Sequence, residues 1–462
     1  MGRQLIAETI KRVGERVQVA GWVSVRRDHG KLIFIDLRDA SGLLQLVFRP
    51  DDAELYRTAE QLRPEWVIAA EGTLCERPKG MENPELATGR VELPVEKLEI
   101  LAEAKTPPFP LDSDGLDIDE EMRLQYRYLD LRRERLQKNI RLRSRLIQAS
   151  REYLFSQGFV EIETPLLTKS TPEGSRDFLV PSRLHPGKFY ALPQSPQQYK
   201  QLLMIGGFER YFQIARALRD EDLRADRGFE HTQIDLEMSF VDEVAVMEVV
   251  EGVVGALCQA AGALIKERPF PVFSYREAVK KFGADKFDLR TEAEKKKGIL
   301  SFAWVKDFSM FEKDDGGGWT YSHNPFTAPR VEDRDKLLAA EDIGTLVSRQ
   351  YDLISNGVEV GGGGIRIHER EVLEKVFEIL GHSPQNIQER FGHMLEAFEY
   401  GAPPHGGIAL GVDRLLMVIT GEKYLREVQA FPMTSGGKTA VMDAPSGVGP
   451  QQLKELHLKV AE

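Results

Sequence analysis

Residues 211–240, YFQIARALRDEDLRADRGFEHTQIDLEMSF, decide the fold, because they predict two antiparallel strands joined by a charged loop. The first run is apolar and rich in β-forming residues, and it leads into Arg219-Asp220-Glu221. From Thr232 onward, apolar and polar residues alternate as they do in a half-buried strand. Arginine offers a planar fork for phosphate or carboxylate, and glutamate can accept a hydrogen bond from an amine. The stretch alone fits either a salt-bridged hairpin or a ligand-binding hairpin.

Composition sets limits on the architecture. The chain has 462 residues, too many for one compact core, so we expect two or three domains. No apolar run approaches the ~20 residues of a membrane span, and the N-terminus lacks the apolar core of a signal peptide, so we expect a cytoplasmic protein without a membrane partner. The cysteines, Cys75 and Cys258, are far apart, which argues against a disulfide framework or a cysteine zinc site. The net charge of −11 means that a nucleic-acid partner would need local basic patches.

Residues 15–102 read as about five short strands with turn signals between them, which favours a small Greek-key barrel, most simply an OB-fold. Such barrels bind single-stranded nucleic acid by stacking bases on aromatic rings in a basic groove. The candidate contacts are two cations, a ring and an amide: Arg26, Arg27, Phe34 and Gln45. The alternative for Phe34 is an ordinary place in the barrel core.

The middle of the chain predicts a linker and then helix and strand. Residues 103–120 are rich in proline and acid, and residues 122–159 read as one helix that carries many arginines, whose simplest interpretation is a solvated face. VEIETPLL follows as a strand that ends at Pro165. Further on, Pro196 can begin a helix, with Gln197 and Lys200 on one of its faces.

Residues 351–370 predict two strands around a turn at Asn356-Gly357. The second strand holds four glycines, 361–364, which weaken a strand unless a ligand or another backbone approaches closely. Asp352 and Glu359 supply oxygen ligands of the kind that Mg²⁺ takes beside a nucleotide phosphate.

Several of these segments resemble the class II aminoacyl-tRNA synthetases. The hairpin resembles motif 2 of that superfamily, and its words ARALRDEDLRADR and TQIDLEMSF resemble the aspartyl enzymes of the bacterial type. The helix and strand before Pro165 resemble motif 1, which builds a homodimer interface in the superfamily, and GVDRLLM (411–417) resembles motif 3. The resemblance implies an α+β multidomain protein: an OB-fold anticodon-binding barrel, a hinge, a catalytic domain on an antiparallel sheet flanked by helices, and a C-terminal extension. The implied bounds are 1–102, 103–131, 132–430 and 431–462.

The implied activity is ATP-dependent formation of aspartyl-adenylate from L-aspartate, followed by transfer to the 3′ end of tRNA-Asp. The catalytic residues would be Arg219, Glu359 and Arg414, with Asp352 and Glu359 as Mg²⁺ ligands. The implied ATP-binding residues are Arg219, Asp220, Glu221, Gly228, His231, Glu359, Gly411, Val412, Asp413 and Arg414. The implied aspartate-binding residues are Glu173, Gln197, Lys200, Arg219, Asp235, His323 and Arg366.

Related specificities remain as alternatives. A lysyl pocket needs acid at its base, and an asparaginyl pocket gains nothing from two cations, whereas Lys200 and Arg366 match the aspartate carboxylate. An asparaginyl enzyme, a paralogue that does not charge tRNA and an enzyme that makes asparagine on the same core are the alternatives to an aspartate–tRNA ligase.

The chain also departs from the pattern that it resembles. The large inserted domain of the bacterial form is reduced to a link near residues 291–300. Asn324 stands where a second histidine is usual, His231 where phenylalanine is usual, and Gly228 where glutamine is frequent.

The barrel positions that the resemblance assigns to the anticodon are Arg27, His29, Phe34 and Gln45. In that family, histidine at the position of His29 often accompanies aspartylation of tRNA-Asn as well as tRNA-Asp, whereas leucine accompanies strict tRNA-Asp enzymes. An imidazole can donate or accept according to its tautomer, so it can tolerate either anticodon base. We therefore expect His29 to relax discrimination and tRNA-Asn to be a second substrate.

Overall fold

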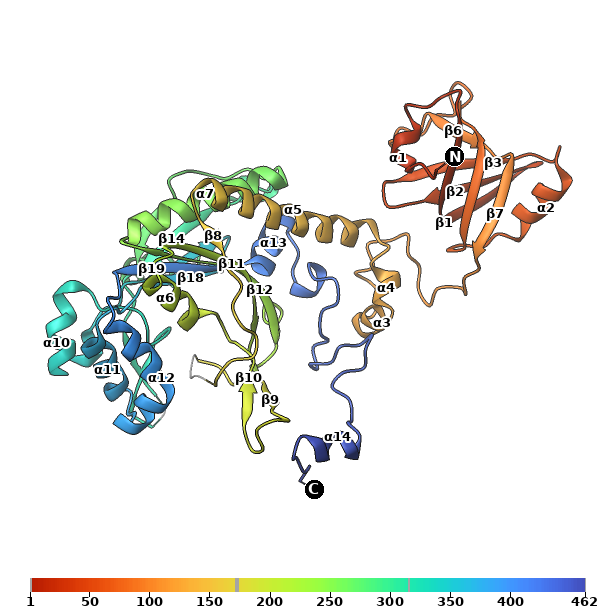
Figure 1. Ribbon diagram of the computed structural model, residues 1–462. Helices are drawn as coiled ribbons and strands as arrows, with labels where there is room; N and C mark the ends of the chain where they lie inside the picture. Colours follow the sequence, from red (N-terminus) through yellow and green to blue (C-terminus); the bar gives the residue numbers. More distant parts are fainter. Residues whose placement is uncertain (1, 171–173, 315, 462) are drawn as a thin grey trace. The chain divides into compact units, whose positions relative to one another are not determined.

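A computed structural model describes residues 2–170, 174–314 and 316–461 of the chain (Figure 1). They form two compact units that divide between Ser113 and Asp114, a boundary that falls inside the predicted hinge. Each unit has its own hydrophobic core.

The first unit is one curled sheet in the strand order β5-β6-β3-β2-β1-β4-β7. The strand β1 is long enough to pair with two neighbours, β4 along its first half and β2 along its second. A register shift between Val23 and Val25 bends β1 where it changes partner, as a β-bulge does. The small barrel is therefore as predicted, but the two-residue strand β5 was missed because it is too short to show alternation. The elements are α1 (Ile6–Thr9), β1 (Arg16–His29), β2 (Leu32–Arg38), β3 (Leu43–Phe48), α2 (Ala53–Gln61), β4 (Val67–Thr73), β5 (Cys75–Glu76), β6 (Val91–Pro94) and β7 (Lys97–Ala102).

The second unit is built on an eight-stranded sheet in the order β13-β14-β17-β18-β19-β12-β11-β8. Its inner pairs are antiparallel, as predicted, and only the two edge pairs, β13 with β14 and β11 with β8, are parallel. The sheet strands are β8 (Val160–Glu161), β11 (Arg210–Leu218), β12 (Glu230–Ser239), β13 (Val272–Ser274), β14 (Phe302–Lys306), β17 (Gln350–Ser355), β18 (Val358–Ile365) and β19 (His405–Gly411). Two small hairpins add β9 (Leu179–Pro181) with β10 (Phe189–Ala191) and β15 (Phe311–Lys313) with β16 (Trp319–Tyr321).

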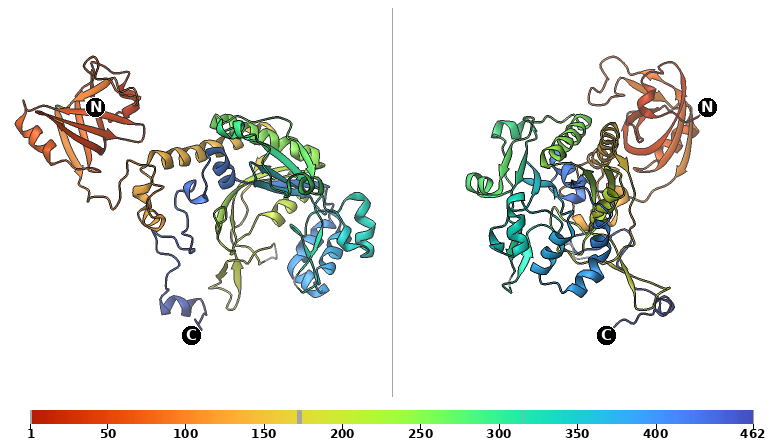
Figure 2. Two further views of the ribbon diagram at one scale, coloured as in Figure 1. Left: turned by 180° about the vertical axis from the view of Figure 1, so that it is seen from behind. Right: turned by 60° about the vertical axis from the view of Figure 1, so that its left-hand side comes forward.

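Helices cover the sheet on both sides. Figures 1 and 2 show α5 (Glu134–Ser156) and α7 (Glu243–Ala261) side by side on one face, while α6 (Gln197–Ile205) lies on the other. The remaining helices are α3 (Glu120–Gln125), α4 (Arg127–Asp130), α8 (Tyr275–Phe282), α9 (Glu292–Lys296), α10 (Arg334–Ala339), α11 (Arg370–Ile379), α12 (Pro384–Phe398), α13 (Val412–Thr420) and α14 (Pro450–Glu455). Short 3₁₀ turns occur at Val331–Asp333, Ile343–Thr345 and Leu425–Glu427.

The arginine-rich segment predicted as one helix is divided into α3, α4 and α5. Three guanidinium groups converge on the buried carboxylate of Asp130 in this region, from Arg123, Arg127 and Arg133. Arg123 also reaches Glu427 at 2.8 Å. Burial would raise the pKa of Asp130, but these arginines hold it below its usual value. Within the run predicted as a solvated face, Arg132 to Arg151, Arg133 therefore turns inward, whereas Lys138, Arg141 and Arg145 are exposed as expected.

The strand predicted to end at Pro165 is also shorter than expected, because only Val160 and Glu161 pair with β11. The link that replaces a large insertion is compact. Its helix α9 has a capping box between Thr291 and Glu294, and it connects β13 to β14, which are neighbours in the sheet. A short link is therefore enough to join the two strands, and the sheet is not interrupted where the large insertion is absent.

Helix α7 is 19 residues long and apolar enough to span a membrane, which the composition analysis did not anticipate. Most of its valines and its leucine are buried against α5 and the sheet, including Val246, Val250, Val253 and Leu257. Packing in the core of this unit accounts for the apolar composition of α7.

Candidate active site

The predicted hairpin is formed by β11 and β12, whose register runs from Arg210 opposite Met238 to Leu218 opposite Glu230. Alternate side chains of β12 point to opposite faces of the sheet. Ile234 and Leu236 enter the core that α5 and α7 cover, whereas His231, Gln233 and Asp235 line a cavity of about 280 Å³ on the other side. The two-residue period that predicted the strand therefore also produces a polar floor.

One end of the cavity is a buried cluster of two cations and two carboxylates. Lys200 Nζ lies 3.0 Å from Asp235 Oδ2 and 3.2 Å from Glu237 Oε2, and Arg366 Nε lies 2.8 Å from Glu237 Oε1. Burial would raise the pKa of Glu237, but Arg366 and Lys200 lower it to about 2. Burial raises the pKa of Asp235 to about 6, which Lys200 only partly opposes. We call Lys200, Asp235, Glu237 and Arg366 the charge tetrad.

The sequence analysis missed Glu237. The signal that could have found it is its spacing, since it stands two residues after Asp235 on the same face of β12. It links the two predicted cations, and an ideal Cβ at the neighbouring Gly407 would lie only 2.1 Å from its Oε2. Asp235 Oδ1 is buried without a hydrogen-bond partner among the described residues, so it can accept from a ligand.

The opposite wall carries Asp352 on β17 and Glu359 on β18, on either side of Gly362. An ideal Cβ at Gly362 would lie 3.1 Å from Asp352 Oδ1 and 3.8 Å from Glu359 Oε1, so glycine keeps the space between the carboxylates open. His323 Nε2 approaches Asp352 Oδ2 at 3.4 Å, and Lys286 Nζ lies 2.8 Å from Glu359 Oε2. Lys286, which precedes the predicted link, was not anticipated as a site residue.

These partners set the charges of the wall. Burial opposes the charged form of His323, but the contact with Asp352 raises the pKa of the imidazole. Burial raises the pKa of Asp352, and its bond with His323 only limits the shift. For Glu359, Lys286 outweighs burial and lowers the pKa. In the described part of the chain no cluster of three or more histidine, cysteine or acidic side chains suits a metal. Two carboxylates nevertheless fit Mg²⁺, which usually takes one or two of them together with substrate phosphates.

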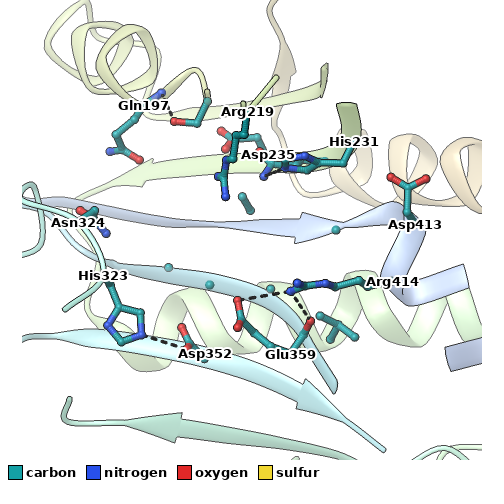
Figure 3. Close-up of a pocket in the computed structure, with 18 of the residues that line it drawn as sticks. Gln197, Arg219, His231, Asp235, His323, Asn324, Asp352, Glu359, Asp413 and Arg414 are labelled. Atoms are coloured by element: carbon teal, nitrogen blue, oxygen red, sulfur yellow. Dashed lines mark hydrogen bonds and ion pairs between the residues drawn. The ribbon is translucent and has the colours of Figure 1, made fainter. Parts of the chain in front are cut away.

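Figure 3 shows His231, Asp413 and Arg414 at the other end of the cavity, away from Gln197, with Arg219 between the two ends. Arg414, near the start of α13, contacts the Glu359 carbonyl at 3.1 Å and Asp226 Oδ2 at 3.1 Å. Asp413 accepts from the Thr232 backbone N–H. The ring of His231 is neutral near pH 7, because burial and the nearby charge of Arg219 lower its pKa to about 3.

Most of the predicted catalytic, ATP and aspartate residues meet in this one cavity. Its lining includes Gln197, Lys200, Arg219, Glu221, Gly228, His231, Asp235, His323, Asp352, Glu359, Arg366, Gly411, Asp413 and Arg414. Asp220 and Val412 are not part of the lining; Asp220 faces Arg176, and Val412 is packed in the core. Glu173 lies outside the described residues. Asn324 also lines the cavity, and its Oδ1 accepts from the Phe326 backbone N–H, which holds the local turn.

In the barrel, the four predicted anticodon residues share one face of the sheet. Arg27 pairs with Phe34 across β1 and β2, and His29 is the last residue of β1, beside the Gly30-Lys31 turn. Arg27 also binds Asp36 at 2.6 Å, and Gln45, opposite Asp36, donates to Glu92. Phe34 is half-buried on the face opposite to Ile33 and Ile35, so it is not an ordinary core residue. Arg26 bonds to Asp28 and to the Glu60 carbonyl.

Comparison with known proteins gives the family. A profile described as tRNA synthetases class II (D, K and N) matches residues 119–435, and one described as OB-fold nucleic acid binding domain matches residues 17–101, which confirms the predicted barrel fold. The chain is 42% identical to an aspartate–tRNA(Asp/Asn) ligase of Syntrophomonas wolfei, with 97% of each chain covered. It is 41% identical to an aspartate–tRNA ligase of Geobacillus kaustophilus, again with 97% of each covered.

Among solved structures, asparaginyl-tRNA synthetase from Pyrococcus horikoshii superposes with a TM-score of 0.74 at 23% identity, over 94% of this chain and 98% of that one. This likeness supports the fold alone. The alignment with the Syntrophomonas relative extends over 574 positions, 112 more than the length of this chain, in agreement with the predicted loss of a large insertion.

Proposed function

The chain belongs to the class II tRNA synthetases of the D, K and N group, and from this premise we propose that its cavity joins aspartate to ATP and then to tRNA. The observation that carries the proposal is the order of groups along one cavity. Gln197, which shares α6 with Lys200, lies at one end, His231 and Arg414 lie at the other, and Arg219 lies between them.

The charge tetrad is the proposed amino-acid end. Lys200 and Arg366 are the cations suited to the side-chain carboxylate of aspartate, and His323, whose pKa is raised by its contact with Asp352, lies on the opposite wall. Gln197 and the free oxygen of Asp235 suit the ammonium group. Glu173 is assigned to that group on the resemblance alone.

In the first step, an oxygen of the aspartate α-carboxylate bonds to the α-phosphorus of ATP. The bond from that phosphorus to the bridging oxygen breaks, and pyrophosphate leaves. Arg219, which lies midway along the cavity, stabilises the charge that builds on the phosphoryl oxygens. No protein nucleophile takes part, so catalysis comes from positioning and charge.

The nucleotide end is assigned to the neighbourhood of Arg414. The guanidinium of Arg414 and the neutral ring of His231 would hold the adenine between them, and Glu221 would accept from the adenine amine. Asp352 and Glu359 would hold Mg²⁺, which neutralises phosphate charge when bound. Lys286 and Arg414 would keep Glu359 ionised and in place.

In the second step, a ribose hydroxyl of the terminal tRNA nucleotide attacks the aspartyl carbonyl carbon, an ester bond forms, and AMP leaves with the proton. The barrel face with Arg27, His29, Phe34 and Gln45 would bind the anticodon. We include tRNA-Asn as a substrate because His29 is exposed at the end of β1, where a base edge can reach it. The names of the relatives support both possibilities, since one is a tRNA(Asp/Asn) ligase and another a tRNA ligase for aspartate.

A homodimer is also proposed, through the edge of the large sheet. The strand β8 is the last in the sheet order, and apolar side chains near it are exposed: Phe155, Val160, Leu166 and Leu167. An exposed edge with apolar neighbours favours association with a second copy.

The test of the function is aspartate-dependent exchange of pyrophosphate into ATP, followed by charging of purified tRNA-Asp and tRNA-Asn. We expect exchange with aspartate and not with asparagine or lysine. Exchange that depends on asparagine would assign the cavity to the rival specificity, and exchange without charging would indicate a paralogue that lacks tRNA transfer.

A further inference from the structure

Gln233 lies on the floor of the cavity between the two proposed ends. It stands on β12 opposite Gly411, and its same-face neighbours are His231 and Asp235, each about 7 Å away along the strand. Its side chain is 7% exposed. The sequence analysis gave it no role, because a glutamine in an alternating strand is indistinguishable from any other polar residue.

The amide of Gln233 is half satisfied. Its Nε2 lies 3.0 Å from Nε2 of His231, whereas its Oε1 is buried and has no hydrogen-bond partner among the residues that the structure describes. A buried acceptor without a donor is uncommon in proteins, and one that lines a cavity is explained most simply by a ligand that supplies the donor.

In the structure the amide nitrogen of Gln233 faces His231, which requires the proton of the neutral imidazole to be on Nδ1. The His231 ring is neutral, because burial and the nearby arginines lower its pKa to about 3, so its Nε2 can accept from the Gln233 amide N–H. The Oε1 of Gln233 is thereby left as the atom that can meet a substrate.

The choice of ligand follows from the donors that the proposed substrates carry. The aspartate ammonium would have a stronger partner in the free oxygen of Asp235, and the adenine amine is assigned to the end of the cavity with Arg414. Carboxylate and phosphate oxygens accept and do not donate. The donors left for the middle of the cavity are ribose hydroxyls, from ATP or from the terminal nucleotide of tRNA.

We propose that Gln233 Oε1 accepts a hydrogen bond from a ribose hydroxyl at the junction of the amino-acid and nucleotide ends, and that His231 is the positioning residue for this amide. The inference rests on the proposed function and adds to it a contact for the sugar. It also gives His231 a second role, because the ring would position the Gln233 amide as well as pack against adenine.

The test compares the parent with Gln233→Met, Gln233→Glu, His231→Phe and the double variant His231→Phe/Gln233→Met. Methionine keeps the volume and removes the acceptor, glutamate keeps an acceptor oxygen, and phenylalanine keeps the ring but removes its bond to the amide. The ATP arm measures equilibrium binding and exchange with ATP, 2′-deoxyATP and 3′-deoxyATP. The tRNA arm measures single-turnover transfer from preformed adenylate.

We expect Gln233→Met to lower either the affinity for ATP or the rate of transfer to tRNA by about three- to tenfold, which corresponds to the loss of one neutral hydrogen bond. A loss of preference for ATP over one deoxy analogue assigns the ATP ribose, and slower transfer with unchanged exchange assigns the tRNA ribose. Gln233→Glu should keep the preference, and the double variant should be no worse than Gln233→Met, because His231 acts through Gln233.

The inference is overturned if Gln233→Met leaves both arms unchanged, if its only effect is weaker aspartate binding, or if the two single substitutions are additive. Binding of ATP and its analogues does not require turnover, so this result is separable from a failure of the proposed function. That failure would appear as absent aspartate-dependent exchange in the parent.

Discussion

The guanidinium of Arg366 lies 2.8 Å from the carboxylate of Glu237, and both side chains are almost completely buried. The pair connects two strands at one end of the active-site cavity, because Glu237 belongs to β12 and Arg366 directly follows β18. Removing one partner of such a pair leaves a charge in the protein interior, which costs far more than losing a surface ion pair.

We therefore expect Glu237→Gln to lower the free energy of unfolding by about 3–5 kcal/mol, since Arg366 and Lys200 would lose their shared carboxylate. Urea denaturation of the second unit measures this. The control is Glu248→Gln on α7, an exposed carboxylate for which we expect a change within about 0.5 kcal/mol. Equal stability of the two variants would contradict a structural role for Glu237.

The same group predicts an acid limit to stability. The pKa of Glu237 is about 2 in the folded protein and 4.5 for the ordinary side chain, so the folded state binds its proton more weakly. Its contribution to stability is fully present above pH 4.5 and is lost as the pH falls toward 2. Denaturation measured across this window should show a steeper loss for the parent than for Glu237→Gln. Parallel curves would mean that Glu237 is not ionised as inferred.

The sequence predicted the elements that local patterns encode and missed the contacts that the fold creates. The hairpin, the turn at Asn356-Gly357 and the face of α6 with Gln197 and Lys200 follow from short-range periodicity, and all are present. Lys286 reaches Glu359 from 73 positions earlier in the chain, a pairing that no local pattern reports. Polar residues in an alternating strand normally face solvent, so the pattern gave no sign that Gln233 lines a cavity or that Glu237 is fully buried.

The arginine-rich segment is a second place where local spacing did not report a contact made by the fold. A run of arginines predicts a solvated helix face when only helical spacing is considered. The structure buries Arg133 of that run, and Arg127 before it, around Asp130, whereas Lys138, Arg141 and Arg145 remain exposed. The sequence contained the ion pairs but not the information that they turn inward.

Lys200→Met is expected to weaken aspartate use by about 2–5 kcal/mol, because a ligand carboxylate would lose a partner in a dry pocket and Asp235 would lose its counter-charge. ATP binding, at the other end of the cavity, should change little. Exchange kinetics with varied aspartate and varied ATP separate the two effects. Aspartate-dependent exchange within about twofold of the parent would remove Lys200 from the specificity site.

Arg219→Ala should lower the maximal rate of adenylate formation far more than the affinity for aspartate, because the charge that Arg219 meets develops during the reaction. Its position between the two ends of the cavity is the structural reason for this expectation. Single-turnover adenylate formation at saturating aspartate and ATP measures it. A raised Michaelis constant with an unchanged maximal rate would assign Arg219 to ground-state binding instead.

The last prediction concerns the choice of tRNA and depends on His29. This residue ends β1 and is exposed, on the same face as Arg27 and Phe34. The anticodons of tRNA-Asp and tRNA-Asn differ in one base, cytosine or uracil, whose pairing edges are donor-rich and acceptor-rich respectively. An imidazole can meet either edge by changing tautomer, whereas leucine bonds to neither and leaves discrimination to its neighbours.

We therefore expect the parent to aspartylate both tRNAs and His29→Leu to shift the ratio toward tRNA-Asp. The measurement is kcat/KM for each purified transcript, with Lys31→Leu as a control, because Lys31 is also exposed and lies in the adjoining turn. Aspartate-dependent exchange requires no anticodon, so it should be the same in all three proteins. A parent that prefers tRNA-Asp by several hundredfold, or a ratio that His29→Leu leaves unchanged, would make His29 an ordinary turn residue and leave the protein specific for one tRNA.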